Sequence, residues 1–389
     1  MKKKLAVFTT HPIQYQVPIW RQLAKTPDLD LVVHYFSDFS VRGGVDSGFG
    51  VSVAWDVPLL DGYESRFITC DANITKFRSV KIPDPESLFK KEAFDFVLIN
   101  GYMYAFERQV VHYAKLANTR VILRGELTDS QRPGRGKLKT FFRDFYLRWF
   151  YRHIYAFCYV GEEARKHLIR MRISPEKMFF SPYSVYYTLF ESKRQKFTQC
   201  RSALNVPDDQ FTFLFSGKMI PRKMPLLLAE AFRHMSKNDK LALIMVGDGP
   251  QKNILEGLLR PVLKSRLIMP GFVNQSELGK YFMAADAFVL PSEYETWGLV
   301  VNEAMLFSLP VIVSNAVGCR NDLIIPDQTG YVFQSGDVES LVNAMQRLAK
   351  DPQKARIMGE NARNRVGKYS TSASVRGILD AINSLQGFM

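Results

Sequence analysis

Glu295 and Glu303 are separated by seven residues inside the largely apolar stretch PSEYETWGLVVNEAM (291–305). A buried carboxylate that lacks a partner costs several kcal/mol, so each acid needs either water or a ligand. One interpretation leaves both acids in contact with solvent. The other is a binding site for a ligand rich in hydroxyl groups, which would donate hydrogen bonds to both carboxylates.

A helix is predicted to begin near Gly298 and Leu299, directly after Glu295. The free N–H groups and partial positive charge of a helix start favour phosphate. Glu303 would lie one to two turns inside this helix. A pyrophosphate at the helix start would therefore have a carboxylate on either side, each able to accept hydrogen bonds from sugar hydroxyls.

A second group that could do chemistry is cationic. Lys218, Arg222 and Lys223 follow the apolar run FTFLFSG (211–217), and two or three cations there would neutralise a diphosphate. A solvated basic turn explains the same residues. The GDG triplet (247–249) is a weak signal on its own, because a tight turn accounts for it equally well.

The elements that must position these residues are short apolar runs alternating with helical patterns, which is typical of β-α-β units and parallel sheets. Segment 37–80 is predicted to be irregular, and the chain is predicted to be helical from about 337 onward. Buried strands are expected at 5–10, 29–36, 95–100, 119–125, 154–161, 211–217, 241–247, 265–273, 286–292 and 309–315.

Two domains are predicted, residues 1–190 and 191–389, because the polar, charged stretch 191–210 has the composition of an interdomain connection. Each is an α/β domain of the doubly wound, Rossmann-like kind, and the last helices are candidates to pack back on the N-terminal domain. Ligands bind at the carboxyl ends of the strands in such folds. With two such domains, the site is expected in a cleft between them.

The segments SGKMIPRKMP, VGDGP, MPGFVNQSELGKYFMAADAFVLPSEYETWGLVVNEAM and LPVIVSNAVGCRNDLI together resemble the retaining GT-B glycosyltransferases. The resemblance covers roughly 211–350 closely, and its most specific element is the Glu295/Glu303 pair. The first half is similar more loosely, through THPIQYQVPIW and YVGEEARKHLIRMRISPEKMFFSPYSVYYTLF. The resemblance implies two Rossmann-like domains facing across a cleft. It also implies sugar transfer from a UDP- or GDP-sugar to a glycan, a lipid-linked saccharide or another acceptor.

The resemblance also assigns roles to the acids. Glu303 would bind the ribose hydroxyls of the nucleotide, and Glu295 would orient the donor sugar and take part in catalysis. These roles would satisfy both carboxylates with sugar hydroxyls, so the third acid of the stretch, Glu293, is expected at the surface.

The remaining donor contacts implied by the resemblance involve backbone and lysines. Lys218 and Lys223 would hold the pyrophosphate and stabilise it as it leaves. The backbone groups implied at the phosphates are those of Gly217, Gly298, Leu299 and Val300, and those bordering the base are Gly271, Phe272 and Val273.

Several positions depart from the family pattern. Lys218 stands where arginine is usual, which keeps the charge but loses the bidentate fork, and Ser308 replaces a common glycine. Where many members present a histidine, this chain has LRGELTDS, so Glu126 becomes the candidate acceptor-side catalytic group. A salt bridge from Glu126 to Arg124 is the alternative.

After the first strand, His11 and Gln14 are candidates for the acceptor side, with capping or packing as the alternative. Because a nucleoside diphosphate leaves with negative charge, catalysis is expected to rest on electrostatic stabilisation by the helix start and the lysines, with no metal or other cofactor. The leaving phosphate itself could take the acceptor proton. A covalent intermediate would need a carboxylate at the anomeric carbon, and none is assigned to that role.

The formal net charge is +14 and the pI is near 9.5, which indicates attraction to an anionic partner. Residues 137–153 place Leu138, Phe142, Phe145 and Trp149 on one side of a predicted helix. Either this side faces a core and the bases are solvated, or the helix lies on anionic lipid. Residues 132–152 are therefore a candidate membrane-binding surface, which would suit a lipid-linked acceptor.

Other bulk features limit the function classes. The four cysteines lack metal or disulfide spacing, which favours a reducing cytoplasm, with peripheral attachment to the inner face of the membrane as a further expectation. The apolar run after the basic start is too short for a signal peptide.

A catalytically silent GT-B scaffold that binds a nucleotide sugar or a partner transferase is the alternative function. Nucleic-acid binding is not favoured, because no recognition module is visible.

Overall fold

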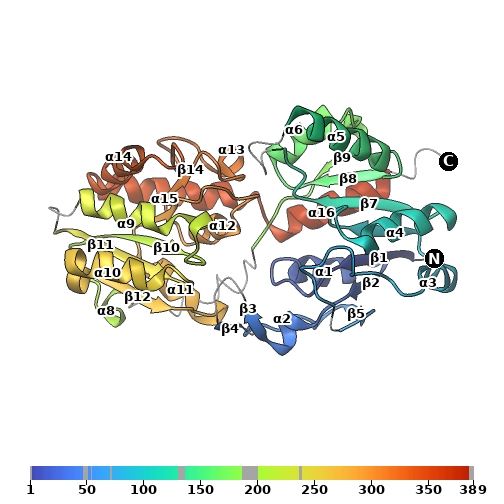
Figure 1. Cartoon of the computed structure of the whole chain (residues 1–389), viewed down its shortest axis with the longest axis horizontal. Helices are drawn as coiled ribbons and strands as arrows, with labels where there is room; N and C mark the ends of the chain where they lie inside the picture. Colours follow the sequence, from blue (N-terminus) through green and yellow to red (C-terminus); the bar gives the residue numbers. More distant parts are fainter. Residues whose placement is uncertain are drawn as a thin grey trace. The chain divides into compact units, whose positions relative to one another are not determined.

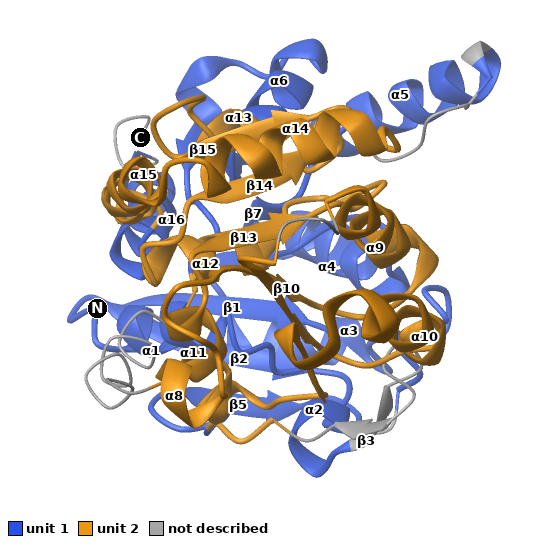
Figure 2. Ribbon diagram, turned by 90° about the vertical axis from the view of Figure 1, so that its left-hand side faces the viewer, with its two compact units in different colours: residues 1–43, 58–184, 370–389 blue, residues 44–57, 185–369 orange. Residues whose placement is uncertain are grey.

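The computed structural model describes residues 2–46, 51–53, 55–70, 72–129, 136–185, 200–235 and 239–384. The chain forms two compact units (Figure 2). Unit 1 comprises Met1–Gly43, Pro58–Ser184 and Ser370–Met389, and unit 2 comprises Gly44–Val57 and Val185–Tyr369. Of the predicted interdomain connection, 191–210, residues 191–199 lie outside the described residues, and Cys200–Ala203 form a short helix.

Unit 1 is built on a seven-stranded sheet with the order β5-β2-β1-β6-β7-β8-β9, in which every neighbouring pair is parallel (Figure 1). Strands β1 and β6 are buried along nearly their whole length, as expected for strands covered on both faces. The strands are β1 (Lys3–Thr9), β2 (Leu29–Tyr35), β5 (Glu64–Phe67), β6 (Phe96–Ile99), β7 (Arg120–Gly125), β8 (Ala156–Tyr159) and β9 (Met178–Phe180).

The helices of unit 1 include one that comes from the end of the chain. Helix α16 contacts α1, β8 and β9, and the Ser374 hydroxyl donates to the Pro182 carbonyl. A Cβ on Gly377 would lie 2.0 Å from the Phe180 carbonyl oxygen, so only glycine allows this close packing. The helices are α1 (Val17–Ala24), α2 (Phe39–Arg42), α3 (Pro85–Glu92), α4 (Ala105–Leu116), α5 (Lys137–Tyr151), α6 (Glu162–Arg170) and α16 (Thr371–Asn383), with the 3-10 turn η1 (Pro175–Lys177).

Unit 2 is built on a six-stranded parallel sheet with the order β12-β11-β10-β13-β14-β15. Its central strands β10 and β11 are buried at every residue. The strands are β10 (Phe211–Ser216), β11 (Leu241–Val246), β12 (Leu267–Gly271), β13 (Ala287–Leu290), β14 (Val311–Ser314) and β15 (Gly330–Phe333). A separate antiparallel pair is formed by β3 (Gly44–Asp46) and β4 (Val51–Val53).

The helices of unit 2 cover this sheet and contribute to its core, which includes Leu228, Leu255 and Met345. Asp56, far away in sequence, accepts the Ser276 N–H at 3.1 Å and so caps the start of α11. The helices are α8 (Cys200–Ala203), α9 (Pro225–His234), α10 (Lys252–Leu263), α11 (Gln275–Ala284), α12 (Leu299–Leu306), α13 (Arg320–Leu323), α14 (Val338–Ala349) and α15 (Pro352–Val366), with the 3-10 turns η2 (Pro221–Lys223) and η3 (Lys264–Arg266).

The predicted fold class is confirmed, and each of the ten predicted runs contains a strand. Five of the described strands were not predicted: β3 and β4 pair only with each other, and β5, β9 and β15 lie at the edges of the two large sheets. Strand β5 alternates exposed and half-buried residues, so it lacks the continuous apolar run that marks a central strand. The prediction that 37–80 is irregular was therefore wrong for this edge strand, for the pair β3 and β4, and for α2.

Candidate functional site

The candidate donor site of unit 2 forms where two parallel strands end side by side. Strands β10 and β13 are neighbours in the sheet, so the segments that follow them meet at its carboxyl edge. The Glu293 N–H donates to the Arg222 carbonyl at 3.0 Å, and Arg222 Nη1 donates to the Tyr294 carbonyl at 3.1 Å. The two segments are thus joined by hydrogen bonds. Glu293 itself is exposed, as expected.

Glu295 is buried, and both oxygens of its carboxylate lie near polar or charged partners. Oε1 forms an ion pair with Lys223 Nζ and accepts the Ser292 hydroxyl at 3.1 Å. Oε2 lies 3.7 Å from Arg222 Nη1. The structure therefore brings together Glu295 and Lys223, and adds Arg222 and Ser292. The basic run IPRK is a sequence signal for Arg222, whereas Ser292 carries no signal of its own.

Gly298 lies directly before α12, and its backbone conformation favours glycine. Its φ is +95°, in the left-handed region that favours glycine. A Cβ would also lie 3.1 Å from Val317 Cγ1 and 3.2 Å from Leu290 Cδ2. The first turn of α12 carries no acidic side chain of its own, and the N–H groups at a helix start, here including those of Leu299 and Val300, have no partner within the helix.

Glu303 is buried in α12, one turn after the helix begins at Leu299. The preceding residue, Asn302, is also buried and accepts the Trp297 Nε1–H at 2.9 Å, which ties the helix to the segment that leads into it. The same short loop and helix therefore carry Glu295, the helix start and Glu303.

Glycines at neighbouring strand ends pack backbone against backbone. A Cβ on Gly247 would lie 1.9 Å from the Gly217 carbonyl oxygen, and the Gly247 N–H donates to the Gly271 carbonyl at 2.9 Å. Close packing thus accounts for the first glycine of the GDG triplet, in line with the tight-turn interpretation. Gly217 and Gly271 lie at the same edge as Glu295, and Lys218, Phe272 and Val273 follow them, all half-buried.

In unit 1, Arg124 is fully buried at the end of β7. It donates to the Ser181 hydroxyl at 2.8 Å and to the Pro182 carbonyl at 3.1 Å, and its guanidinium lies 5.4 Å from the Tyr183 ring centroid. Burial raises the pKa of Tyr183 well above its usual value, and the charge of Glu126 and its hydrogen bond to the phenol add to this. Glu126 therefore engages Tyr183, while its charge also acts on Arg124.

His11 and Gln14 follow β1, whose carboxyl end lies at the same sheet edge as that of β7. His11 Nδ1 is 2.9 Å from the Thr10 hydroxyl, and its ring meets Phe39 at a centroid distance of 5.4 Å. Burial lowers the pKa of His11 to about 4, so the imidazole is neutral at physiological pH. Gln14 is buried.

The apolar side of α5 faces outward. Leu138, Phe145 and Trp149 are 69%, 69% and 53% exposed, while Leu147, Phe150 and Tyr151, on the opposite side, are buried. The interpretation of a core-facing aromatic side is therefore wrong for these residues. Figure 2 shows the beginning of α5 extending past the rest of unit 1. Residues 132–135 of the predicted basic segment lie outside the described residues.

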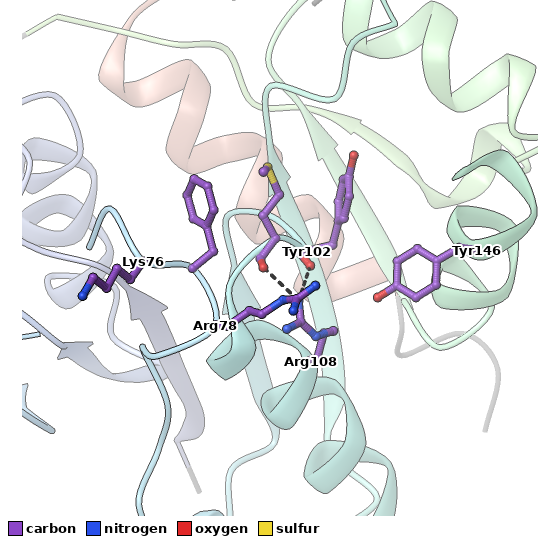
Figure 3. A pocket seen from close by; sticks show the side chains of 7 residues that line it. Lys76, Arg78, Tyr102, Arg108 and Tyr146 are labelled. Atoms are coloured by element: carbon purple, nitrogen blue, oxygen red, sulfur yellow. Dashed lines mark hydrogen bonds between the residues drawn. The ribbon is translucent and has the colours of Figure 1, made fainter. Parts of the chain in front are cut away.

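Unit 1 also contains a pocket of about 680 Å³ (Figure 3). Sequence reasoning missed it, because its walls come from four separate segments and no single segment has a recognisable motif. The lining residues are Lys76, Phe77, Arg78, Tyr102, Met103, Arg108 and Tyr146.

None of the helices described is long and apolar enough to cross a membrane. Within the described residues, no cluster of three or more His, Cys, Asp or Glu side chains is arranged to hold a metal ion.

Comparisons with known proteins concern the carboxyl-terminal half of the chain and the overall fold. Residues 196–365 match the family described as Glycosyl transferases group 1. The UDP-Gal:alpha-D-GlcNAc-diphosphoundecaprenol alpha-1,3-galactosyltransferase of Escherichia coli is 30% identical over 214 residues, which cover 54% of this chain and 54% of that enzyme. Sulfoquinovosyl transferase SQD2 of Arabidopsis thaliana is 37% identical over 147 residues, covering 37% of this chain and 28% of that protein. The chain thus spans about half of the first relative's length and less of the second's.

Solved structures share the fold over nearly the whole chain. Anabaena Alr3699/HepE in complex with UDP matches with a TM-score of 0.74 at 16% identity, covering 99% of this chain and 100% of that chain. A glycosyltransferase from Rickettsia africae matches with a TM-score of 0.76 at 17% identity, covering 99% of each chain. The GT-B fold predicted from the sequence, with two Rossmann-like domains, is therefore confirmed.

Proposed function

We propose that this protein is a retaining glycosyltransferase that moves a sugar from a nucleoside diphosphate to a hydroxyl of a glycan or lipid-linked saccharide. The observation that carries the proposal is the buried Glu295 carboxylate, which is paired with Lys223 directly before the start of α12. A carboxylate, an ammonium group and free helix N–H groups at one strand edge suit a ligand that combines hydroxyls with a diphosphate. The family match of residues 196–365 supports it.

In the proposed mechanism, the diphosphate lies at the start of α12 and accepts N–H groups of Gly298, Leu299 and Val300. Lys223 and Lys218 stabilise the negative charge that grows on the leaving phosphate oxygen. Because Lys223 is already held by Glu295, its ammonium group is oriented before the donor arrives. These residues supply the electrostatic stabilisation that many transferases take from a metal ion, and we propose a metal-independent reaction.

Glu295 has a second role in the proposal. With one oxygen on Lys223 and Ser292, its remaining lone pairs can accept hydrogen bonds from hydroxyls of the donor sugar and fix the ring. Glu303 would accept the ribose hydroxyls, and the backbone of Gly217 and residues 271–273 would border the pyrophosphate and the base. The relatives favour uridine as that base, since one is a UDP-Gal transferase and one solved structure holds UDP.

On the acceptor side, we propose that Glu126 contacts the incoming hydroxyl or the donor sugar. Its hydrogen bond to Tyr183 holds the carboxylate in place, as a positioning contact would. His11, neutral through burial, and Gln14 would shape the acceptor region rather than carry charge. In a reaction that retains configuration, the leaving phosphate takes the proton as the hydroxyl attacks from the same face.

A membrane role for α5 completes the proposal. The outward side chains of Leu138, Phe142, Phe145 and Trp149 form an exposed aromatic face. Lys139 and Arg148 flank it and are exposed, whereas Asp144 lies on the inner side and pairs with Arg143 and Arg170. An apolar face edged by cations and free of acids fits an anionic lipid surface. We propose that the enzyme works in the cytoplasm, bound peripherally to the inner face of the membrane.

The deciding experiment is a screen of UDP- and GDP-sugars for a rise in the melting temperature of the purified protein and for slow donor hydrolysis without acceptor. We expect at least one UDP-sugar to stabilise the fold, by about 2.7 kcal/mol at a hundredfold excess over Kd, and to be hydrolysed. Proton NMR of the released or transferred sugar then reads its anomeric configuration, which should match the donor. Stabilisation without hydrolysis or transfer would favour a silent scaffold, and no stabilisation by any donor would contradict the proposal.

A further inference from the structure

We propose that the pocket of unit 1 binds the phosphate or diphosphate group of a lipid-linked acceptor, with the lipid chain running onto the outer face of α5. This inference rests on the proposed function, because it names the class of acceptor. Three observations support the inference: the position of the pocket, the charge of its walls and its continuity with α5.

The position of the pocket is that of a ligand site in a doubly wound sheet. Tyr102 and Met103 follow β6, which lies between β1 and β7 in the sheet. Ligands bind at the carboxyl ends of parallel strands, and here the flanking strands β1 and β7 end at Thr9 and Gly125, just before His11 and Glu126. The pocket therefore shares one sheet edge with the acceptor-side residues proposed above.

The charge of the walls selects an anion. Lys76, Arg78 and Arg108 line the pocket, and its described lining includes no carboxylate. Figure 3 shows Arg78 and Arg108 reaching the same part of the pocket. Two guanidinium groups that converge in this way repel each other unless an anion lies between them, and phosphate is the anion that arginine binds with paired hydrogen bonds.

Arg108 is held in place for such a contact. Its Nη1 donates to the Tyr102 carbonyl at 3.2 Å and to the Met103 carbonyl at 2.8 Å, which leaves the guanidinium's other N–H groups for a ligand. The adjacent acid, Glu107, is buried and accepts the Tyr104 N–H at 2.9 Å. Glu107 therefore serves the start of α4 and is not part of the pocket wall.

The remaining walls are apolar and lead onto α5. Phe77 and Met103 are exposed at the pocket. Tyr146 belongs to α5, and its ring centroid lies 6.0 Å from that of Trp149, which is part of the exposed aromatic face. Tyr146 and Tyr102 both contact the buried Phe150, at centroid distances of 6.1 and 6.2 Å. A free phosphate would leave this apolar wall exposed, whereas a phosphate ester on an apolar chain would cover it.

The test compares farnesyl diphosphate, kept below its micellar concentration, with farnesol and with inorganic pyrophosphate, each by calorimetric titration of the full chain. We expect farnesyl diphosphate to bind at least about tenfold more tightly than either fragment. The double variant Lys76→Gln/Arg78→Gln should weaken that binding by about tenfold or more, because a hydrogen bond to a charged group contributes about 1.5–3 kcal/mol. A charge-matched variant, Lys115→Gln/Arg356→Gln, alters exposed cations outside the pocket and should bind like the wild type.

Three results would overturn the inference. Equal affinity of the pocket variant and the wild type would show that the cations do not hold the probe. Equal affinity for pyrophosphate and farnesyl diphosphate would indicate a site for a free anion. Loss of binding to phosphatidylglycerol vesicles without loss of farnesyl diphosphate binding would assign the cations to bulk lipid headgroups instead. Unchanged melting temperatures of both double variants exclude misfolding as the cause.

These titrations need no nucleotide sugar, so they stand apart from the donor screen. One outcome is that no donor stabilises the protein but the pocket variant binds farnesyl diphosphate more weakly than the wild type. The proposed transfer reaction is then contradicted, while the lipid phosphate site is supported. If donors stabilise the protein and the pocket variant binds the probe normally, the transfer reaction stands and only the acceptor class is lost.

Discussion

Lys223 and Glu295, separated by 71 intervening residues, form an ion pair at the carboxyl edge of the unit 2 sheet. The pair exists because β10 and β13 are parallel neighbours, so that the turn after one meets the loop after the other. Both side chains are largely buried, at 14% and 9% exposure. The pair compensates the charge of Glu295, an acid in an otherwise apolar stretch, and it places a cation beside the loop that leads into α12.

Removal of this cation should mainly affect turnover. Replacement of Lys223 by methionine removes the charge proposed to stabilise the leaving phosphate, so we expect kcat to fall by about 100-fold or more, with a smaller rise in KM for the donor. Steady-state kinetics with the donor found in the screen measures both. Lys350→Met, an exposed lysine in unit 2, is the matched control. A variant that keeps wild-type kcat would rule out this role.

The two glutamates should differ in their effects. Glu303→Ala removes the proposed ribose contact and should weaken the affinity for UDP itself by about 1.5–3 kcal/mol, or roughly 10- to 150-fold. Glu295→Ala should spare the affinity for UDP more than turnover, because UDP lacks the donor sugar. Titration of UDP and kinetics with the full donor separate the two effects. An equal loss of UDP affinity in both variants would contradict the assigned roles.

The exposed face of α5 should bind anionic vesicles. Phe145→Ser/Trp149→Ser removes two of its aromatic side chains, and we expect Kd for vesicles containing phosphatidylglycerol to rise about tenfold or more. Lys139→Gln and Arg148→Gln should each cost about 1 kcal/mol at low salt.

Ile254→Ser/Ile357→Ser is a matched control, because both isoleucines are exposed in unit 2. Vesicle cosedimentation that is the same for the aromatic variant and this control would exclude α5 as the membrane contact.

Ser308 provides a test of backbone strain. It follows α12 with φ at +60°. In this conformation a Cβ is sterically unfavourable, and glycine, which has none, avoids the penalty. We expect Ser308→Gly to raise the free energy of unfolding by about 0.5–1 kcal/mol, measured by urea unfolding. A destabilised variant would show that the serine side chain outweighs the strain.

His34 should make unit 1 sensitive to acid. Burial lowers the pKa of this histidine to about 4, with the charge of Arg66 lowering it further and that of Glu92 opposing the shift, and its ring stacks on Phe8 at 4.7 Å. Between about pH 6.5 and 4 the unfolded chain binds a proton at this site and the folded chain does not. The contribution to stability is therefore fully present above pH 6.5 and falls as the pH drops.

At pH 5 this loss amounts to about 2 kcal/mol relative to pH 7.5. His34→Phe, which keeps an aromatic ring against Phe8, should remove that part of the pH dependence. Urea unfolding of the variant and the wild type at both pH values gives the difference directly, and parallel pH profiles for the two proteins would contradict the assignment.

The sequence by itself determined the central strands, since continuous apolar runs bounded by polar turns have few other solutions in an α/β chain. It also determined which residue types are available for chemistry: an acid before a helix, a second acid one turn inside it, and cations after a strand. The edge strands β5 and β9 were not predicted, because short strands with exposed residues lack that apolar run.

The tertiary structure determined which residues come into contact. The order β10-β13 in the sheet is not the order in the chain, and only that order places Lys223 against Glu295. The orientation of α5 was open for a similar reason: aromatic residues lie on both sides of the helix, and periodicity alone does not say which side is covered. The pocket of Arg78, Arg108 and Tyr146 combines loop, α4 and α5, and no local pattern encodes a site assembled from segments so far apart.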